Sequence, residues 1–213
     1  MWTSKIQEHI TVILFLALIS LTSNVFGQDI SSVQASKYLH DGGLVIILPS
    51  YSKKIALIDS LLASDEVSRK SKSNLRKRRE ETLEKKRNEL LFFAGALKKY
   101  YPLGPLAFAY DTVLPLNGQQ KVYNGMFIDT SGHVDVQIEM HAPLLIARPV
   151  RTQEQGLEAY TFADEKGHAV ARPFPKYILR HHLYDRMLGF FKRKNPEEMA
   201  ARRFVRQLIN AQR

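Results

Sequence analysis

The sequence predicts one α/β or α+β domain built as a sandwich around a single mixed β-sheet, and three observations support this prediction. Short apolar segments typical of strands alternate with segments of helical spacing. The first two apolar segments, 44–48 and 106–110, are separated by two expected helices, as in a parallel pair of strands. Later apolar segments follow one another closely, as antiparallel strands do, and helices end the chain.

The first strand is expected at 44–48, after the turn signal Asp41-Gly42-Gly43. Its residues are apolar at every position, which indicates a strand buried on both faces. Hydroxyl residues at 50–52 can cap a following helix, whose apolar residues recur at helical spacing from 55 to 62. We expect this helix to pack on the sheet. Residues 29–38 are interpreted as a polar lead-in.

A long helix is expected at about 73–101, where Gly95 is the only Gly or Pro. Its first half is almost wholly polar, and its second half becomes apolar from Leu90 onward. A helix that projects into solvent at its start and packs on the core at its end explains both halves. Ten Lys or Arg residues stand against three Glu between Arg69 and Arg87, so the basic cluster lies on the projecting half.

The second half of the chain contains further strands and two C-terminal helices. A second core strand is expected at 106–110. Shorter strands are expected at 125–129, 134–138 and 144–147, and a hairpin at 157–162 and 168–171. The helices are expected at about 176–191 and 196–211, the second with Asn195 as its cap and Pro196 in its first turn.

Two sheet arrangements fit this order of elements. The first is thioredoxin-like without a Cys-x-x-Cys motif, with a parallel pair first, a hairpin later and helices on both faces. The second is a small Rossmann-like sheet, which would give much of the same pattern. The order of the elements leaves both alternatives open.

Residues 1–27 have the layout of a cleavable secretory signal peptide. The apolar run 10–21 forms only about 18 Å of helix against a hydrocarbon core of roughly 30 Å, which favours cleavage over a membrane anchor. Val25 and Gly27 suit positions −3 and −1 of the cleavage site. We therefore expect residues 28–213 to form one exported domain, periplasmic or secreted, without a transmembrane segment.

The chain contains no Cys and has a net charge of +10. The absence of Cys excludes disulfides, thiol nucleophiles, cysteine zinc sites, iron–sulfur clusters and a lipoprotein anchor. The positive charge favours anionic partners, such as a membrane surface, lipopolysaccharide or an acidic glycan. Nucleic acid is not expected as the partner of an exported protein. Four consecutive residues of the long helix are the candidate binding residues: Arg76, Lys77, Arg78 and Arg79. The alternative is a solvated helix face that binds nothing.

A pocket rim is expected where the two parallel strands end, because α/β folds bind ligands at the carboxyl ends of their strands. Ser50, Tyr51 and Lys53 follow the first strand, and Asp111 follows the second. The alternative is that the hydroxyl residues at 50–52 only cap the helix.

His133, Asp135 and His141 would converge if the strands near 133–138 and 141–147 were neighbours. Such a group could act as a metal or acid/base site of a hydrolase or metal-dependent enzyme. The alternative is a set of exposed turn residues. No His-Glu-x-x-His spacing, phosphate loop or nucleophile elbow is present, and we expect no metal and no cofactor.

Three stretches of the chain carry a family resemblance: 44–62 with its Lys54-Ile55-Ala56-Leu57 block, 106–111, and 156–177 with its Pro173-Phe174-Pro175 segment. Together they span roughly residues 42–180, over which the chain resembles a family of small exported proteins of Bacteroidota with no known activity. Many members have a Cys before the second strand, where this chain has 103–105. The resemblance implies one α/β domain in an exported setting, without a thiol role.

The sequence therefore predicts a non-catalytic exported binding domain whose basic surface contacts an anionic partner, either a component of the cell envelope or another protein. A periplasmic or secreted hydrolase or metal-dependent enzyme that uses His133, Asp135 and His141 is the alternative.

Overall fold

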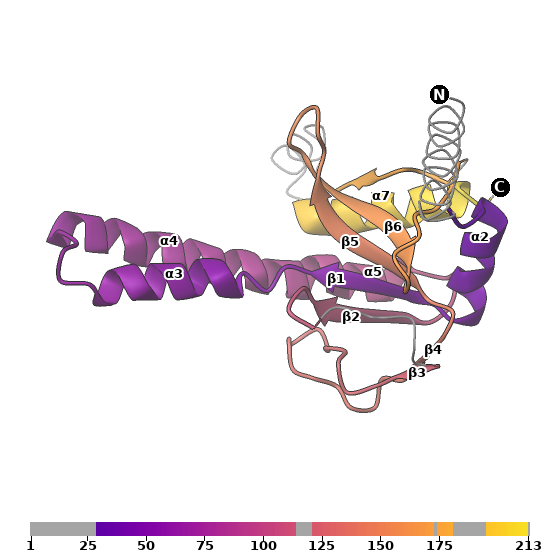
Figure 1. Cartoon of the computed structure of the whole chain (residues 1–213), viewed down its shortest axis with the longest axis horizontal. Coiled ribbons are helices and arrows are strands. Elements are labelled where there is room, and N and C mark those ends of the chain that lie inside the picture. The colour runs from indigo at the N-terminus through magenta and orange to yellow at the C-terminus, as the bar shows by residue number, and fades with distance from the viewer. Residues whose placement is uncertain (1–28, 114–120, 173, 181–194, 213) are drawn as a thin grey trace, which may run out of the picture.

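The computed structural model describes residues 29–113, 121–172, 174–180 and 195–212. The predicted signal peptide, 1–27, lies outside these residues. The described part of the chain is a mixed α/β structure around a five-stranded sheet, with a helical hairpin that projects from one end (Figure 1). The predicted fold class is confirmed.

The sheet has the strand order β2-β1-β5-β6-β7. Its strands are β1 (Leu44–Leu48), β2 (Leu106–Tyr110), β5 (Leu145–Arg151), β6 (Glu158–Asp164) and β7 (Ile178–Leu179). β1 runs parallel to both β2 and β5, and β6 runs antiparallel to β5 and β7. All five residues of β1 are buried, so the predicted parallel pair and the fully buried first strand are confirmed.

The two faces of the sheet are covered differently. Leu44, Ile46 and Leu48 face the helices α2 (Ser32–Asp41), η2 (Glu89–Ala94), α5 (Gly95–Tyr100) and α7 (Pro196–Asn210). Val45 and Ile47 face the segment 121–144, which includes the short strands β3 (Val122–Tyr123) and β4 (Met140–His141). Alternate residues of a strand point to opposite faces, which accounts for the two separate clusters.

The thioredoxin-like arrangement stays a prediction. The parallel pair and the later hairpin are present, but the described helices that pack on the sheet lie on one face. An irregular segment covers the other face over β1 and β2.

Aromatic rings fill the centre of the helix-covered face. The Phe93 ring of η2 stacks on the Tyr160 ring of β6 at a centroid distance of 5.7 Å. Phe204 of α7 meets both rings edge to face, at 6.2 Å and 5.5 Å. These contacts join the sheet, the end of the long helix and the C-terminal helix in one core.

The projecting hairpin consists of α3 (Ser52–Ala63) and α4 (Arg69–Asn88) (Figure 1). The expectation that the first of these helices packs on the sheet is wrong, because α3 packs on α4 beyond the end of the sheet. Ile58 is its one buried residue, and Leu57 is 62% exposed. The chain leaves β1 and continues outward instead of folding back over the strands.

The predicted long helix is confirmed, and it begins four residues earlier than expected. α4, η2 and α5 follow one another without a break from Arg69 to Tyr100. The hydroxyl of Ser68 accepts a hydrogen bond from the backbone N–H of Ser71, which caps the first turn.

Three expectations for shorter elements are wrong. The polar lead-in is the helix α2, which begins with a capping box between Ser31 and Gln34. The strands expected at 125–129 and 134–138 reduce to single bridges of Ile128 with Phe108 and Val134. The helix expected from 176 does not begin there, since Ile178–Leu179 is a strand; residues 181–194 lie outside the described part.

The helix expected at 196–211 is confirmed as α7.

Replacement of Phe93 by Ala should lower the free energy of unfolding by about 3–5 kcal/mol, because it leaves a cavity between Tyr160 and Phe204. The adjacent Phe92 is the matched control: it is 41% exposed, while Phe93 is fully buried. Urea denaturation measures both variants. Equal losses for F92A and F93A would contradict this packing.

Candidate functional site

Tyr51 stands where the chain leaves the sheet for the hairpin, just beyond the carboxyl end of β1. Its backbone is left-handed, with φ 56° and ψ 12°, and it is the one non-glycine residue of the described chain with a positive φ. Bulky side chains rarely adopt this conformation, and such residues concentrate at functional sites. The Tyr51 hydroxyl donates a hydrogen bond of 2.6 Å to Oε1 of Glu89.

Glu89 lies at the junction of α4 and η2, and Arg180 follows β7. Nη1 of Arg180 donates to Oε1 of Glu89 at 2.8 Å, and Nη2 donates to Oε2 of Glu197 at 3.2 Å. Only 4% of Arg180 and 1% of Glu89 are exposed. We call the four residues Tyr51, Glu89, Arg180 and Glu197 the Arg180 clamp.

The helix widens at the clamp. η2 is a π-helical turn in which the backbone N–H of Gly95 reaches back to the carbonyl of Leu90. Such turns are rare in α-helices, and those that occur are frequently found at functional sites. Here Glu89 and Phe93 both turn toward the core, and the guanidinium of Arg180 lies 5.2 Å from the centre of the Phe93 ring.

Burial raises the pKa of Glu89, while the charge of Arg180 and the hydrogen bond from Tyr51 offset part of that effect. Burial, together with the bond to Glu89, also raises the pKa of Tyr51, so its hydroxyl stays a neutral donor. Within the described residues three buried atoms near the clamp have no hydrogen-bond partner: Glu89 Oε2, Arg180 Nε and the Tyr160 hydroxyl oxygen.

A second ion pair joins the hairpin to the sheet. Nζ of Lys85 on α4 lies 2.8 Å from Oε1 of Glu158 on β6, and 5.6 Å from the centre of the Tyr51 ring. The ends of α3 and α4 that lie beside the sheet therefore both contact the body of the domain. α3 does so through Tyr51, and α4 through Lys85 and Glu89.

The structure brings the expected pocket rim together. Ser50, Tyr51, Lys53 and Asp111 line one open pocket at the ends of β1 and β2. Oδ1 of Asp111 accepts a hydrogen bond of 3.0 Å from the backbone N–H of Ser50. The Ser50 hydroxyl accepts a hydrogen bond of 3.3 Å from the backbone N–H of Ser52, but the N-cap residue of α3 is Tyr51, whose side chain makes no capping hydrogen bond. Ligand binding at this rim stays a prediction.

The four basic residues expected to bind a partner lie on α4, in the projecting hairpin. Arg79 forms an ion pair of 2.7 Å with Asp59 of α3. Arg76, Lys77 and Arg78 are exposed and form no ion pair with another described residue.

His133, Asp135 and His141 are not brought together. Oδ1 of Asp135 accepts a bond from the backbone N–H of Gln137, and His141 lies 3.3 Å from Glu139. The strands assumed in the prediction are not neighbours, because β4 pairs with β3 instead. In the described ranges no three His, Cys, Asp or Glu side chains are grouped so that they could hold a metal ion.

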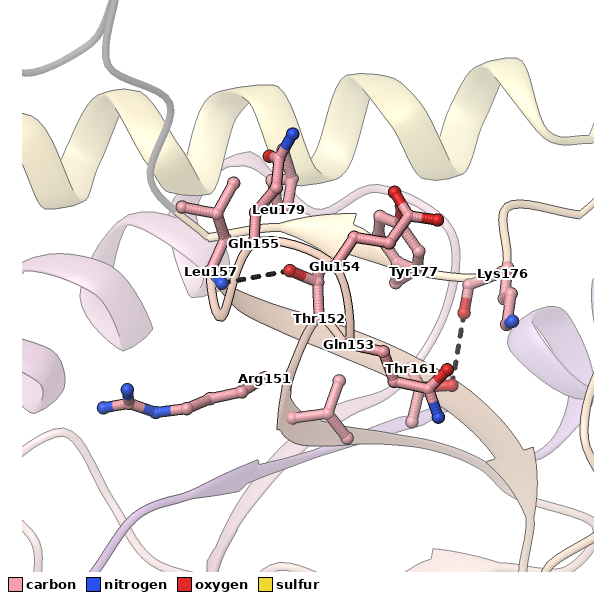
Figure 2. A pocket seen from close by; sticks show the side chains of 11 residues that line it. Arg151, Thr152, Gln153, Glu154, Gln155, Leu157, Thr161, Lys176, Tyr177 and Leu179 are labelled. Atoms are coloured by element: carbon pink, nitrogen blue, oxygen red, sulfur yellow. Dashed lines mark hydrogen bonds between the residues drawn. The ribbon is translucent and has the colours of Figure 1, made fainter.

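A further pocket of about 330 Å³ lies at the loop between β5 and β6 (Figure 2). Leu157 donates its backbone N–H to the Thr152 hydroxyl at 3.0 Å, which closes the loop. The Thr161 hydroxyl donates to the carbonyl of Lys176 at 3.2 Å. The sequence did not predict this pocket.

Sequence reasoning also missed the clamp residues Glu89, Arg180 and Glu197. Glu89 opens the apolar stretch Glu-Leu-Leu-Phe-Phe-Ala and is the one signal that could have been noticed, because a charge at the edge of a core segment needs a partner. Its partner stands 91 residues away, which the sequence does not reveal.

No protein-family model, curated protein or solved structure matches the chain. The resemblance to an exported family of Bacteroidota therefore stays a prediction. None of the described helices is long and apolar enough to cross a membrane.

Replacement of Glu89 by Gln should lower the free energy of unfolding by about 3–5 kcal/mol, because it leaves the buried charge of Arg180 without one of its carboxylates. Glu84 is the control, since it is exposed on the same helix and its replacement by Gln should cost less than about 0.5 kcal/mol. Urea denaturation at pH 7 compares the two variants. A small and equal effect would show that the buried pair does not stabilise the fold.

Proposed function

We propose that this protein is an exported, non-catalytic binding domain whose projecting basic hairpin contacts the anionic surface of the cell envelope. The observation that carries the proposal is the placement of the charge. α4 holds ten Lys or Arg residues against three Glu, and it projects beyond the sheet (Figure 1). Such a projection can reach a surface that the rest of the domain does not touch.

The charges of the hairpin are largely available for an external partner. Two of the ten cations form ion pairs with described residues: Arg79 with Asp59, and Lys85 with Glu158. Unneutralised like charges on one helix repel one another and weaken it. An anionic surface would relieve this repulsion, and it attracts each nearby Lys or Arg by about 1 kcal/mol.

The apolar side chains of α3 add to this surface. Leu57 and Leu61 stand one helical turn apart and are 62% and 39% exposed. Basic residues beside exposed leucines are typical of helices that lie on membrane surfaces. We therefore favour a membrane as the partner over a polyanion that has no apolar part.

The hydrolase alternative receives no support from the geometry. The residues on which it depends, His133, Asp135 and His141, do not form a group that could hold a metal within the described chain. Export rests on the signal-peptide pattern in residues 1–27.

Charge reversal of Arg76, Lys77 and Arg78 to Glu should weaken binding to vesicles of phosphatidylglycerol and phosphatidylcholine by roughly 100-fold, since each of these three cations contributes about 1 kcal/mol. Arg79 is left unchanged because it pairs with Asp59. Co-sedimentation of the mature protein with the vesicles measures binding. Binding by the unchanged protein should also fall as NaCl rises from 50 to 500 mM, because salt screens exposed charges.

The matched control reverses three exposed cations of the body, Lys98, Lys176 and Arg206, and so changes the net charge equally. It should bind almost as well as the unchanged protein. Equal losses for both triple variants would mean that overall charge governs binding and not the hairpin. No binding at 50 mM NaCl would rule out a membrane partner.

A further inference from the structure

A second, smaller pocket of about 260 Å³ lies between the Arg180 clamp and the ends of β5 and β6. Pro49, Pro149 and Val150 form apolar walls, and Tyr51 borders it. Concave sites with apolar walls and a few convergent polar groups are typical of small-molecule binding. The pocket lies at the carboxyl ends of the parallel strands β1 and β5, where α/β folds bind ligands.

Three residues of this pocket have hydrogen-bond donors that no described residue uses. Nη1 and Nη2 of Arg180 are bound to Glu89 and Glu197, whereas Nε is buried without a partner. The Tyr160 hydroxyl is also buried without a partner. A buried polar group without a partner is rare in proteins and calls for a specific explanation, such as a water, an ion or a ligand.

Arg151 supplies the third donor. Leu145 and Ala147 of β5 face the helix-covered side of the sheet. Every second residue of a strand points to the same face, so Arg151 faces that side too. Figure 2 shows the Arg151 side chain extending away from the loop residues Gln153 and Glu154. Its guanidinium forms no ion pair with any residue in the described ranges.

The acceptors that line the pocket are, by contrast, already engaged. The carboxylate of Glu158 is paired with Lys85 at 2.8 Å. Glu89 has one free oxygen, but it does not line the pocket. The hydrogen-bond donors of this pocket that no described residue uses are therefore the guanidinium of Arg151, the Nε–H of Arg180 and the Tyr160 hydroxyl. A guanidinium group matches the planar geometry of a carboxylate.

We propose that this pocket binds a small organic acid, with its carboxylate at Arg151, Arg180 Nε and the Tyr160 hydroxyl. The apolar part of the ligand lies against Pro49, Pro149 and Val150. This site is separate from the cations of the hairpin and does not depend on the proposed membrane binding. A carboxylate also explains why two buried donors are left without protein partners.

Isothermal titration of the mature protein with benzoate tests the proposal, with benzamide as its neutral analogue and inorganic phosphate as an anion without an apolar part. Benzoate should bind, and benzamide and phosphate should bind at least about tenfold more weakly, because hydrogen bonds to charged groups contribute about 1.5–3 kcal/mol. Benzamide binding equal to that of benzoate would overturn the proposal, as would tighter binding of phosphate or no benzoate binding at all.

Two variants locate the site. Arg151→Gln should weaken benzoate binding about tenfold, and Tyr160→Phe should weaken it severalfold without loss of stability, because the hydroxyl has no protein partner. Lys176→Gln is the control: Lys176 borders the neighbouring pocket of Figure 2 and not this one. If R151Q and K176Q bind benzoate equally, the carboxylate does not lie at Arg151 and the proposal fails.

Discussion

Arg180 and Glu89 form a buried ion pair of 2.8 Å at the base of the projecting hairpin. A buried pair contributes little net stability over apolar residues, but removal of one partner is costly. In this structure the pair instead fixes the relative positions of the elements that carry its residues. Arg180 follows the last strand of the sheet, Glu89 lies in the middle of the long helix, and Glu197 lies in the first turn of α7. One guanidinium therefore holds three elements at fixed positions, and Tyr51 adds the root of α3 through the same carboxylate.

This placement explains how a highly basic hairpin can project from a small domain. α3 and α4 bury few side chains between them, and like charges on α4 repel one another. The direction of the hairpin must then be determined at its base, where the clamp and the pair between Lys85 and Glu158 lie. The two sites that we propose lie apart: the hairpin for an anionic surface, and the pocket beside the clamp for a small carboxylate.

The sequence predicted those features that local patterns determine. Five consecutive apolar residues identified β1, and Asn195 with Pro196 identified the start of α7. The change from polar to apolar residues predicted that the long helix projects at one end. The direction of α3 was missed because its apolar residues have the spacing of a core helix, although most of them meet solvent. The clamp was missed because Arg180 and Glu89 meet only in the folded chain, and the grouping of His133 with His141 failed because strand pairing is non-local.

A distance measurement across the clamp tests most directly whether the buried ion pair fixes the hairpin. The chain has no Cys, so spin labels can be attached at Lys70→Cys, near the tip of the hairpin, and at Lys176→Cys, two residues before β7. Pulsed electron–electron double resonance on residues 28–213 should give one narrow distance distribution with Glu89 present. The same labels in the Glu89→Gln background should give a broad distribution, measured at pH 7 without denaturant and once circular dichroism has shown that the variant is folded. Equally narrow distributions in the two backgrounds would contradict the account.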